Sequence, residues 1–498
     1  MAIAPAAKAA PISERRPDTG LPLVLDVDGA LLRTDLLHEA AIAYVKANPL
    51  GIVLLFWWLV QGKAVLKRRL AERVSLEINN LPVNEALVDH ARAAHASGRL
   101  VCLATAADEL LALKLAQRFD FISFVIASDG KSNLKGAAKA AALRERFPDG
   151  FAYAGDSRSD LDVWPHAQAI VLAGASPSVA QRARALAKPV EGEFPRRRLG
   201  LRGWAKALRV HQWAKNVLVF VPLVLGGMYA DPAAWAKASL AFLALGLIAS
   251  ATYLINDVWD IEDDRRHWTK RNRAPASGLM TVKQAATAVP VMLVAGFVAG
   301  AFAGLHAVAV LVAYLVLTLA YSFAFKRKPV LDAFTLAVLF PLRLVLGIVA
   351  VGVAASPWLL VFSMFLFASL SFAKRQTEIL RLAGKSDIKT AKLSGRGYFV
   401  SDAPFILAMG VSAGMASIVI MVLYLTQDAM RVRFYDDPVW LWGIPAFLFL
   451  WLSRIWMLCQ RGELDDDPVV FAVRDRKSLI LCAGVALCFA MAWLGMPH

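Results

Sequence analysis

Pairs of closely spaced carboxylates follow short apolar segments in the first third of the chain. Asp26 and Asp28 come directly after the apolar run Leu21–Leu25, and Asp156 and Asp160 follow a later run of the same kind. Two carboxylates that lie two residues apart, where a strand becomes a loop, can present a nucleophile and an acid to one ligand. The spacing therefore predicts a catalytic site at this point of the chain.

Two further polar residues also lie at or after the end of a strand candidate. Thr105 closes the strand candidate that begins at Arg99, and Lys135 opens a helix after the strand candidate Phe121–Ala127. Strands that alternate with helices at this spacing predict a parallel, doubly wound α/β sheet. Ligands of such sheets bind at the carboxyl ends of the strands. We therefore expect Thr105, Lys135 and both carboxylate pairs to converge at one edge of the sheet.

This order of motifs, over about residues 21–175, resembles the haloacid dehalogenase-like (HAD-like) phosphatases. The resemblance implies that Asp26 attacks phosphorus and forms an aspartyl-phosphate. It implies that Asp28 protonates the leaving alkoxide and then activates water, while Thr105 and Lys135 hold the phosphoryl oxygens. Transfer of a phosphoryl group needs this combination of a positioned nucleophile and positive charge.

The same resemblance implies a Mg²⁺ ion held by Asp26, Asp156 and the backbone carbonyl of Asp28, with Asp160 supporting these ligands. It also implies a helical cap at about 36–95. An alternative for this part of the chain is a non-catalytic domain with a regulatory or docking role.

A second group of carboxylates, Asp257, Asp260 and Asp264, lies at the end of a long apolar segment and is preceded by Asn256. The i, i+3 and i+7 spacing predicts that the three share one helical face. Like charges repel there, and a bound Mg²⁺ is the simplest reason to place them together. Five cations suited to phosphate oxygens follow: Arg265, Arg266, Lys270, Arg271 and Arg273.

This motif resembles the first aspartate motif of the UbiA-type intramembrane prenyltransferases. Most of that family carries a second aspartate-rich motif, whereas the corresponding loop here holds Lys374, Arg375 and Glu378. The pattern looks like one branch of the family, the decaprenyl-phosphate phosphoribosyltransferases. Further residues that carry this resemblance are Lys215, Asn216, Tyr321, Lys326, Asp332 and Arg343.

In that branch, the donor is phosphoribosyl pyrophosphate (PRPP) and the acceptor is a polyprenyl phosphate. The resemblance implies that the aspartate motif holds the PRPP diphosphate through Mg²⁺, and that Lys374 and Arg375 hold its 5-phosphate. The lipid phosphate would lie beside Lys215 or Arg343, and its oxygen would attack C1 of the ribose. Substrate-binding roles are expected for Asn216, Asn256, Lys270 and Arg273. Tyr321, Lys326, Asp332 and Glu378 are expected to position the substrates.

The composition limits the elements that position these groups. The chain has 498 residues, of which 58% are hydrophobic and 19% are charged. These values exclude a purely soluble protein and a mostly disordered one. The four cysteines form no CxxC pair and predict neither a disulfide framework nor a zinc site. In a membrane protein, the net charge of +16 indicates cytoplasmic loops and anionic ligands, and we expect no nucleic acid partner.

Nine apolar segments are long enough, or nearly so, to cross a bilayer: 215–230, 235–255, 284–303, 305–325, 331–353, 356–373, 403–426, 438–458 and 479–496. The loops on one side hold 28 Lys and Arg residues and those on the other side hold three. This asymmetry predicts a bacterial-type inner-membrane protein whose first domain is cytoplasmic and whose C-terminus lies outside.

We expect a disordered leader at 1–20, the α/β domain at 21–190, a basic linker at 191–209 and an all-α membrane domain at 210–498. The apolar run Leu50–Val60 is too short to span a membrane. It is either a buried helix of the α/β domain or an interfacial helix on the bilayer surface.

Together, the motifs predict a bifunctional membrane enzyme that serves the synthesis of a cell-envelope or glycan sugar donor. It transfers 5-phosphoribose from PRPP to polyprenyl phosphate and then removes the 5-phosphate. The alternative is prenyl transfer from a prenyl diphosphate to an aromatic or other small acceptor, with a first domain that regulates or docks. Candidate protein partners are a second copy of the chain and enzymes that use the sugar donor.

Overall fold

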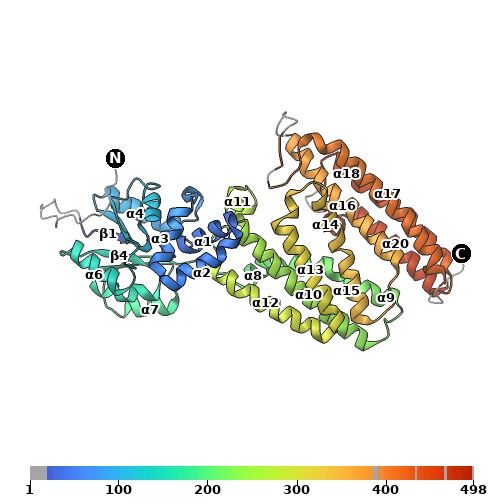
Figure 1. Ribbon diagram of the computed structural model, residues 1–498, viewed down its shortest axis with the longest axis horizontal. Helices are drawn as coiled ribbons and strands as arrows, with labels where there is room; N and C mark the ends of the chain where they lie inside the picture. Colours follow the sequence, from blue (N-terminus) through green and yellow to red (C-terminus); the bar gives the residue numbers. More distant parts are fainter. Residues whose placement is uncertain (1–19, 385–390, 394, 432–434, 465–467, 496–498) are drawn as a thin grey trace. The chain divides into compact units, whose positions relative to one another are not determined.

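A computed structural model describes residues 20–384, 391–393, 395–431, 435–464 and 468–495 (Figure 1). Their contacts form two compact units. The first comprises residues up to Leu208 together with Leu254–Val289, and the second comprises Arg209–Tyr253 and the residues from Pro290 onward. The predicted leader lies outside the described residues, apart from Gly20. The segment Leu254–Val289, expected in the membrane domain, thus packs with the α/β unit.

The first unit contains a six-stranded parallel sheet in the order β3-β2-β1-β4-β5-β6. The strands are β1 Leu23–Leu25, β2 Val101–Asp108, β3 Phe124–Ser128, β4 Ala152–Gly155, β5 Ala169–Ala173 and β6 Val190–Phe194. The first five follow the predicted apolar runs. The sixth runs from the last residue of the expected domain into the expected linker. It was not predicted because this half-exposed edge strand reads Val-Glu-Gly-Glu-Phe and has no apolar run.

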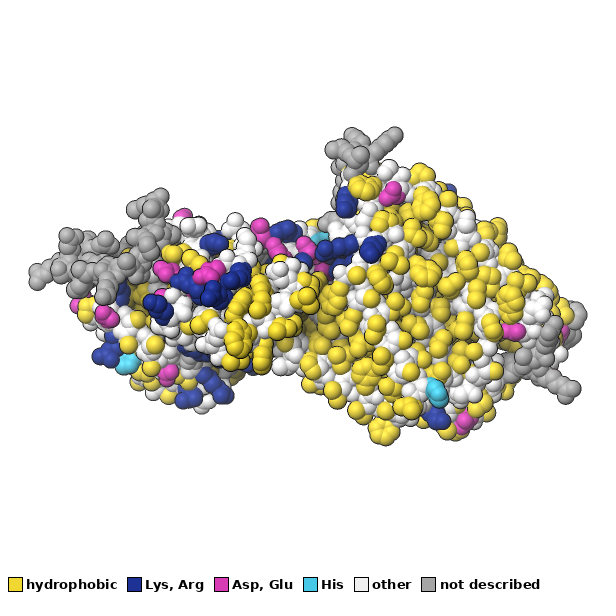
Figure 2. Space-filling view, in the orientation of Figure 1, with side chains coloured by type: hydrophobic (Ala, Val, Ile, Leu, Met, Phe, Trp, Pro, Cys, Tyr) yellow, Lys and Arg dark blue, Asp and Glu magenta, His cyan; other side chains and the backbone are white. Residues whose placement is uncertain are grey.

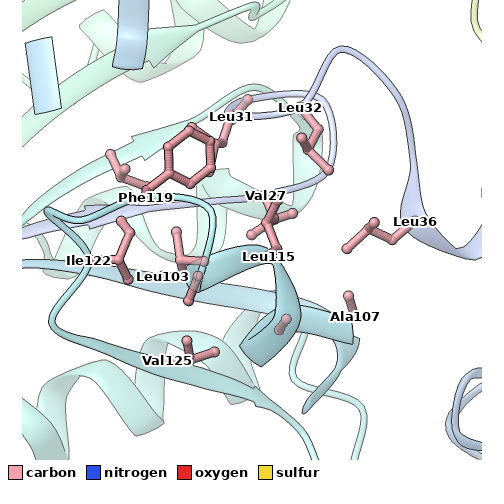
Figure 3. Packing of buried hydrophobic residues seen from close by; sticks show 14 of the residues in the cluster. Val27, Leu31, Leu32, Leu36, Leu103, Ala107, Leu115, Phe119, Ile122 and Val125 are labelled. Carbon is pink, nitrogen blue, oxygen red and sulfur yellow. The ribbon is translucent and has the colours of Figure 1, made fainter. Parts of the chain in front are cut away.

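Helices cover both faces of this sheet. Successive side chains of a strand point to opposite faces; Leu23 and Leu25 pack into one core cluster with α4 and α5, and Val24 packs into another with α6 and α7. Figure 3 shows part of the first cluster around Val27 and Leu103. The helices are α1 Leu36–Ala47, α2 Ile52–Gln61, α3 Lys63–Arg73, α4 Glu85–Ala96, α5 Glu109–Ala116, α6 Ala137–Arg146, α7 Pro177–Arg184 and α8 Leu201–Ala207.

Eight helical segments among the described residues are long and apolar enough to cross a membrane, and hydrophobic side chains cover most of the visible face of the second unit (Figure 2). They are α10 Pro232–Trp259, α12 Val282–Ala303, α13 Leu305–Phe323, α14 Leu331–Leu339 with α15 Pro341–Val351, α16 Pro357–Ala383, α17 Ala403–Gln427, α18 Gly443–Gln460 and α20 Arg476–Leu494. The short helices α11 Ile261–Arg266 and α19 Pro468–Arg474 lie between spans.

The ninth expected span, 215–230, is not among these eight. Its residues fall in the shorter apolar segment Val210–Leu225, which includes a 3₁₀ stretch to Phe220 and the short helix α9 Val221–Leu225. A turn at Gly226 and Gly227 ends this segment before α10 begins.

Small residues allow the helices of the second unit to pack closely. A Cβ atom on Gly410 of α17 would lie 2.2 Å from the Trp456 ring of α18. Ser369 of α16 joins the same contact, because its hydroxyl donates to the Gly410 carbonyl (2.7 Å) and accepts from the Trp456 indole (3.0 Å). These bonds hold together three helices, one of which carries Arg375.

We expect the substitution Leu103→Ala to loosen the α/β unit. Leu103 is fully buried in β2, so truncation leaves a cavity that costs about 2–5 kcal/mol. Native-state hydrogen exchange of the β1 and β2 amides in the full-length protein measures the loss of protection. Leu110→Ala, at a position 37% exposed, is the matched control and should change little. Equal effects of the two substitutions would contradict the burial of Leu103 in this core.

Candidate active sites

The nucleophile candidate lies where the sheet changes winding direction. The chain winds from β1 through β2 to β3 on one side and from β4 to β6 on the other, so β1 and β4 flank the switch point. Asp26 follows β1 and Asp156 follows β4, and the Asp26 N–H donates to the carbonyl of Ala154 (2.9 Å). Ligands of such sheets bind at this position, and the structure brings the two predicted carboxylate pairs together there.

A buried hydrogen-bond network holds Asp26 in place. The Lys139 ammonium donates to Asp26 Oδ1 (2.8 Å) and to the hydroxyl oxygen of Tyr153 (2.9 Å), and that hydroxyl donates to Asp160 Oδ1 (2.8 Å). Asp160 Oδ2 accepts from the backbone N–H groups of Asp156 and Ser157. Lys139 is 4% exposed, so its charge acts on the carboxylates with little screening by solvent.

Three of these carboxylates are close enough to share a cation. Asp26, Asp156 and Asp160 each offer an oxygen, and the three oxygens lie within 4.8 Å of one another. Asp156 Oδ1 is buried without a hydrogen-bond partner among the described residues. A Cβ atom on Gly29, where φ is +87°, would lie 2.2 Å from Asp156 Oδ2, so only glycine lets the loop approach this closely. The donor set suits Mg²⁺, which prefers carboxylate oxygens.

Burial and crowding raise the pKa of these acids. Burial, together with the charge of Asp160, raises the pKa of Asp26 to about 6, although the Lys139 charge opposes this effect. Burial and the nearby Asp35 raise the pKa of Asp28 to about 8. Burial and its two carboxylate neighbours raise the pKa of Asp156 well above its usual value. A bound cation would offset the repulsion within the group.

The residues predicted to bind phosphate occupy different places in the structure. Lys135 lines the cavity at this site, but Lys139, which the sequence analysis missed, is the lysine that contacts Asp26. Helix α6 begins at Ala137, so Lys135 precedes the helix and Lys139 occupies its first turn. Thr105 is fully buried, and its hydroxyl oxygen accepts from the Ala107 N–H (3.0 Å).

The cavity has a volume of about 750 Å³ and includes residues far apart in the sequence. Asp26, Asp28 and Asp156 line the cavity, and Lys67 and Arg196 add positive charge. Further lining comes from the end of α2, the start of α3 and the start of α12, through Leu59, Lys63, Thr281, Val282 and Lys283.

The second aspartate group is not one continuous helical face. Asp257 lies in the last turn of α10, Asp264 lies in α11, and Asp260 stands between the helices as the residue before α11. The Arg273 guanidinium bridges the two buried acids, at 3.0 Å from Asp257 Oδ1 and 2.8 Å from Asp264 Oδ2. Burial and the Asp257 charge raise the pKa of Asp264 to about 6, against the opposing Arg273 charge. The structure thus joins Asp257, Asp264 and Arg273, all of which the sequence analysis proposed.

A buried ion pair attaches this segment to the α/β unit. Glu39 lies in the first turn of α1, which begins after Asp35, and its carboxylate accepts two bonds from Arg265 of α11 (2.7 and 3.0 Å). Both side chains are at least 94% buried. Lys46 adds an exposed pair with Asp263 at 2.8 Å. Figure 1 shows α11 beside α1. The aspartate motif and the α/β sheet therefore belong to one packed unit.

The basic motif of the second unit centres on Arg375. This side chain is fully buried in α16 and pairs with Asp332 of α14 (2.7 Å) and with Glu378. Tyr398 also donates to Asp332. Arg375 is therefore held by two acids, whereas the sequence analysis expected a cation free for phosphate. Its Nη2 atom has no hydrogen-bond partner among the described residues.

Other predicted residues lie in the second unit. Arg343 donates to Asn216 Oδ1 (3.2 Å) and stacks over the Tyr314 and Phe340 rings, which explains how a buried arginine is tolerated in a span. The Tyr321 hydroxyl oxygen accepts from Arg396 (2.7 Å), which also lies 3.8 Å from Asp332. Lys326 is buried, whereas Lys215 and Lys374 are half-buried. In the first unit, Asn256 is half-buried and Lys270 is exposed.

Residues 219–471 match the UbiA prenyltransferase family. The chain belongs to that family. It is accordingly a polytopic integral membrane protein and an enzyme of the UbiA superfamily, as the sequence analysis predicted at this coarser level.

Individual relatives differ in how much they match. An uncharacterized protein of Sinorhizobium fredii, y4nM, is 40% identical over 475 residues, 95% of this chain and 92% of that protein. A decaprenyl-phosphate phosphoribosyltransferase of Mycolicibacterium smegmatis is 35% identical over 306 residues, 59% of this chain and 90% of that protein. The solved structure of a UbiA homolog from Archaeoglobus fulgidus bound to DMAPP and Mg²⁺ is 16% identical, covers 58% of this chain and 98% of that one, and has a TM-score of 0.45.

We expect the substitution Glu39→Gln to release α11 from the α/β unit. It leaves the Arg265 charge buried without an anionic partner, which costs about 3–5 kcal/mol. Hydrogen exchange of the α11 amides in the full-length protein measures the loss. Lys46→Gln, which removes the exposed pair with Asp263, is the control and should cost less than about 1 kcal/mol. Unchanged protection of α11 in Glu39→Gln would refute this role of the ion pair.

Proposed function

We propose that the chain is a polyprenyl-phosphate phosphoribosyltransferase fused to a HAD-like phosphatase. The UbiA-type part transfers 5-phosphoribose from PRPP to polyprenyl phosphate, and the α/β domain removes the 5-phosphate from the lipid product. The main support is the 35% identity with a decaprenyl-phosphate phosphoribosyltransferase over 90% of that relative. We place the enzyme in a bacterial inner membrane with its α/β unit in the cytoplasm, on the basis of the loop charges.

In the transfer step, an oxygen of the lipid phosphate attacks C1 of the ribose. The bond from C1 to the pyrophosphate oxygen breaks, and its electron pair leaves with pyrophosphate. A phosphate monoester is already an anion at neutral pH, so this step needs no strong general base. Asp257, Asp260 and Asp264 are the residues that would hold Mg²⁺, which when bound supplies positive charge to the leaving group. Arg273, already paired with two of these acids, adds charge from the protein.

The basic motif supports a donor with a separate monophosphate. Arg375 is oriented by Asp332 and Glu378, yet its Nη2 donor remains available among the described contacts. A guanidinium that is positioned by two acids loses little freedom when it binds a phosphate oxygen. We therefore assign Arg375 to the 5-phosphate of PRPP, with the half-buried Lys374 beside it.

In the phosphatase step, Asp26 attacks phosphorus and the bond to the ribose 5-oxygen breaks. Asp28 gives its proton to the leaving oxygen, and its raised pKa of about 8 keeps that proton in place at neutral pH. Lys139 orients Asp26 and offsets its charge as the phosphate approaches. Asp26, Asp156 and Asp160 would hold Mg²⁺, which neutralises charge on the phosphoryl oxygens when bound. Water then cleaves the aspartyl-phosphate, with Asp28 taking the proton of the water.

Purified protein in detergent with Mg²⁺, PRPP and polyprenyl phosphate tests both steps, with lipid products followed by mass spectrometry. We expect ribosyl lipid from the wild type, phosphoribosyl lipid from Asp26→Asn and no lipid product from Asp257→Asn. Phosphoribosyl lipid from both the wild type and Asp26→Asn would refute the phosphatase step and favour a regulatory or docking domain. Consumption of a prenyl diphosphate with a small acceptor, and no product from PRPP, would favour ordinary prenyl transfer.

Substitution of the two lysines of the proposed phosphatase site should affect hydrolysis to different extents. Lys139→Met removes the charge that contacts the nucleophile, so we expect hydrolysis of phosphoribosyl lipid to fall by about 10²-fold or more. Lys135→Met, which removes a lysine of the same cavity that precedes α6, should lower it less than about tenfold. A larger loss from Lys135→Met than from Lys139→Met would restore the assignment made from the sequence.

A further inference from the structure

Helix α2 exposes an apolar surface that the fold of its own unit leaves uncovered. Val53, Phe56 and Val60 of α2, together with Leu50 just before it, each leave 66–88% of their surface accessible. The helix is nevertheless fixed, because Trp58 is buried against the Tyr44 ring (5.3 Å) and beneath the Arg73 guanidinium (5.1 Å). Exposed apolar patches of this kind mark an interaction surface. Trp58 therefore holds α2 in one orientation, and the exposed apolar side of the helix is suited to contact with another surface.

Positive charge accompanies this apolar helix. The 26 residues from Lys46 to Ala71 contain five Lys and Arg residues and no carboxylate. Lys63 and Arg69, at the start and middle of the adjoining α3, are exposed. Figure 2 shows hydrophobic side chains over α2 with Lys and Arg side chains beside them over α3. An apolar helix with aromatic residues and flanking cations matches the boundary between acyl chains and anionic headgroups.

The end of α2 lies at the same cavity as the start of a membrane span. Leu59 and Lys63 line the cavity of Asp26, and so do Thr281, Val282 and Lys283. Val282 is the first residue of α12, which is long and apolar enough to cross the bilayer. A span that begins at Val282 enters the membrane near this residue, and a cavity lined by Val282 then lies close to the bilayer surface.

We propose that α2 lies in the headgroup region of an anionic bilayer, and that the Asp26 cavity consequently opens toward phosphate groups carried on lipids. Three observations favour a bilayer as the surface that covers α2: the neighbouring span, the flanking cations, and the aromatic residues Phe56 and Trp57. The second half of this proposal rests on the proposed phosphatase function and specifies its substrate class: a membrane-anchored phosphate monoester. The first half, the insertion of α2, stands without it.

Spin labels on the full-length protein in nanodiscs of anionic lipid test the insertion. With Cys482 replaced by serine, one label is placed at Val53 of α2 and a control label at Leu110 of α5, 37% exposed. We expect the Val53 label to be more accessible to oxygen than to a water-soluble nickel chelate, and the Leu110 label to show the reverse. Equal access of both labels to the chelate would overturn the proposal. A Val53 label shielded from both reagents would also overturn it, in favour of a protein partner or a second copy of the chain.

The double substitution Phe56→Ser and Trp57→Ser tests the substrate class. We expect KM for phosphoribosyl lipid to rise at least tenfold, while hydrolysis of water-soluble p-nitrophenyl phosphate stays unchanged. Leu110→Ser with Val190→Ser, at two exposed positions elsewhere on the unit, should alter neither activity. An unchanged KM for the lipid would refute the lipid-facing cavity. If the wild type hydrolyses neither substrate, the proposed phosphatase fails, and the spin labels still decide whether α2 inserts.

Discussion

The buried ion pair between Glu39 and Arg265 fixes the relation between the two aspartate motifs of the first unit. Neither charge is solvated, so each depends on the other for its stability. Arg265 lies one residue after Asp264, and Glu39 lies in the helix that follows the Asp26 loop. A displacement of α11 would therefore expose a charge in the α/β unit as well as move the second motif. The joining segment behaves as part of the sheet domain and not as a free loop between spans.

Each of the three buried polar groups pairs its carboxylates with one basic side chain. Buried carboxylates gather where a ligand is expected, and a basic side chain neutralises them: Lys139 at Asp26, Arg273 at Asp257 and Asp264, and Arg375 at Asp332 and Glu378. A buried carboxylate without a partner is costly, so such a group needs either a compensating charge or a bound proton. These cations are already positioned within the groups, which would limit the reorganisation needed to bind an anionic ligand.

Local patterns in the sequence predicted much of this arrangement. Five strands and eight spans follow their apolar runs because burial dictates composition. Local patterns could not show that Lys139, and not Lys135, contacts Asp26, because this contact depends on where α6 begins. Strand β6 was missed because an edge strand needs no apolar run. The membership of Leu254–Val289 in the first unit rests on Glu39 and Arg265, which lie 226 residues apart, and spacing along the chain carries no information about such a pair.

The proposed reactions explain why one chain would carry both sites. In the proposed reaction, the product would remain anchored in the membrane by its prenyl chain, so a soluble phosphatase would have to come to the membrane surface to meet it. A phosphatase that is linked to the transferase meets this product at a raised effective concentration. Linkage alone does not suffice, because a site that faces away from the bilayer would never reach the headgroup. The segment 254–289 would meet this need under the proposal, because it carries Asp257, joins two candidate spans and contributes Thr281–Lys283 to the cavity of Asp26.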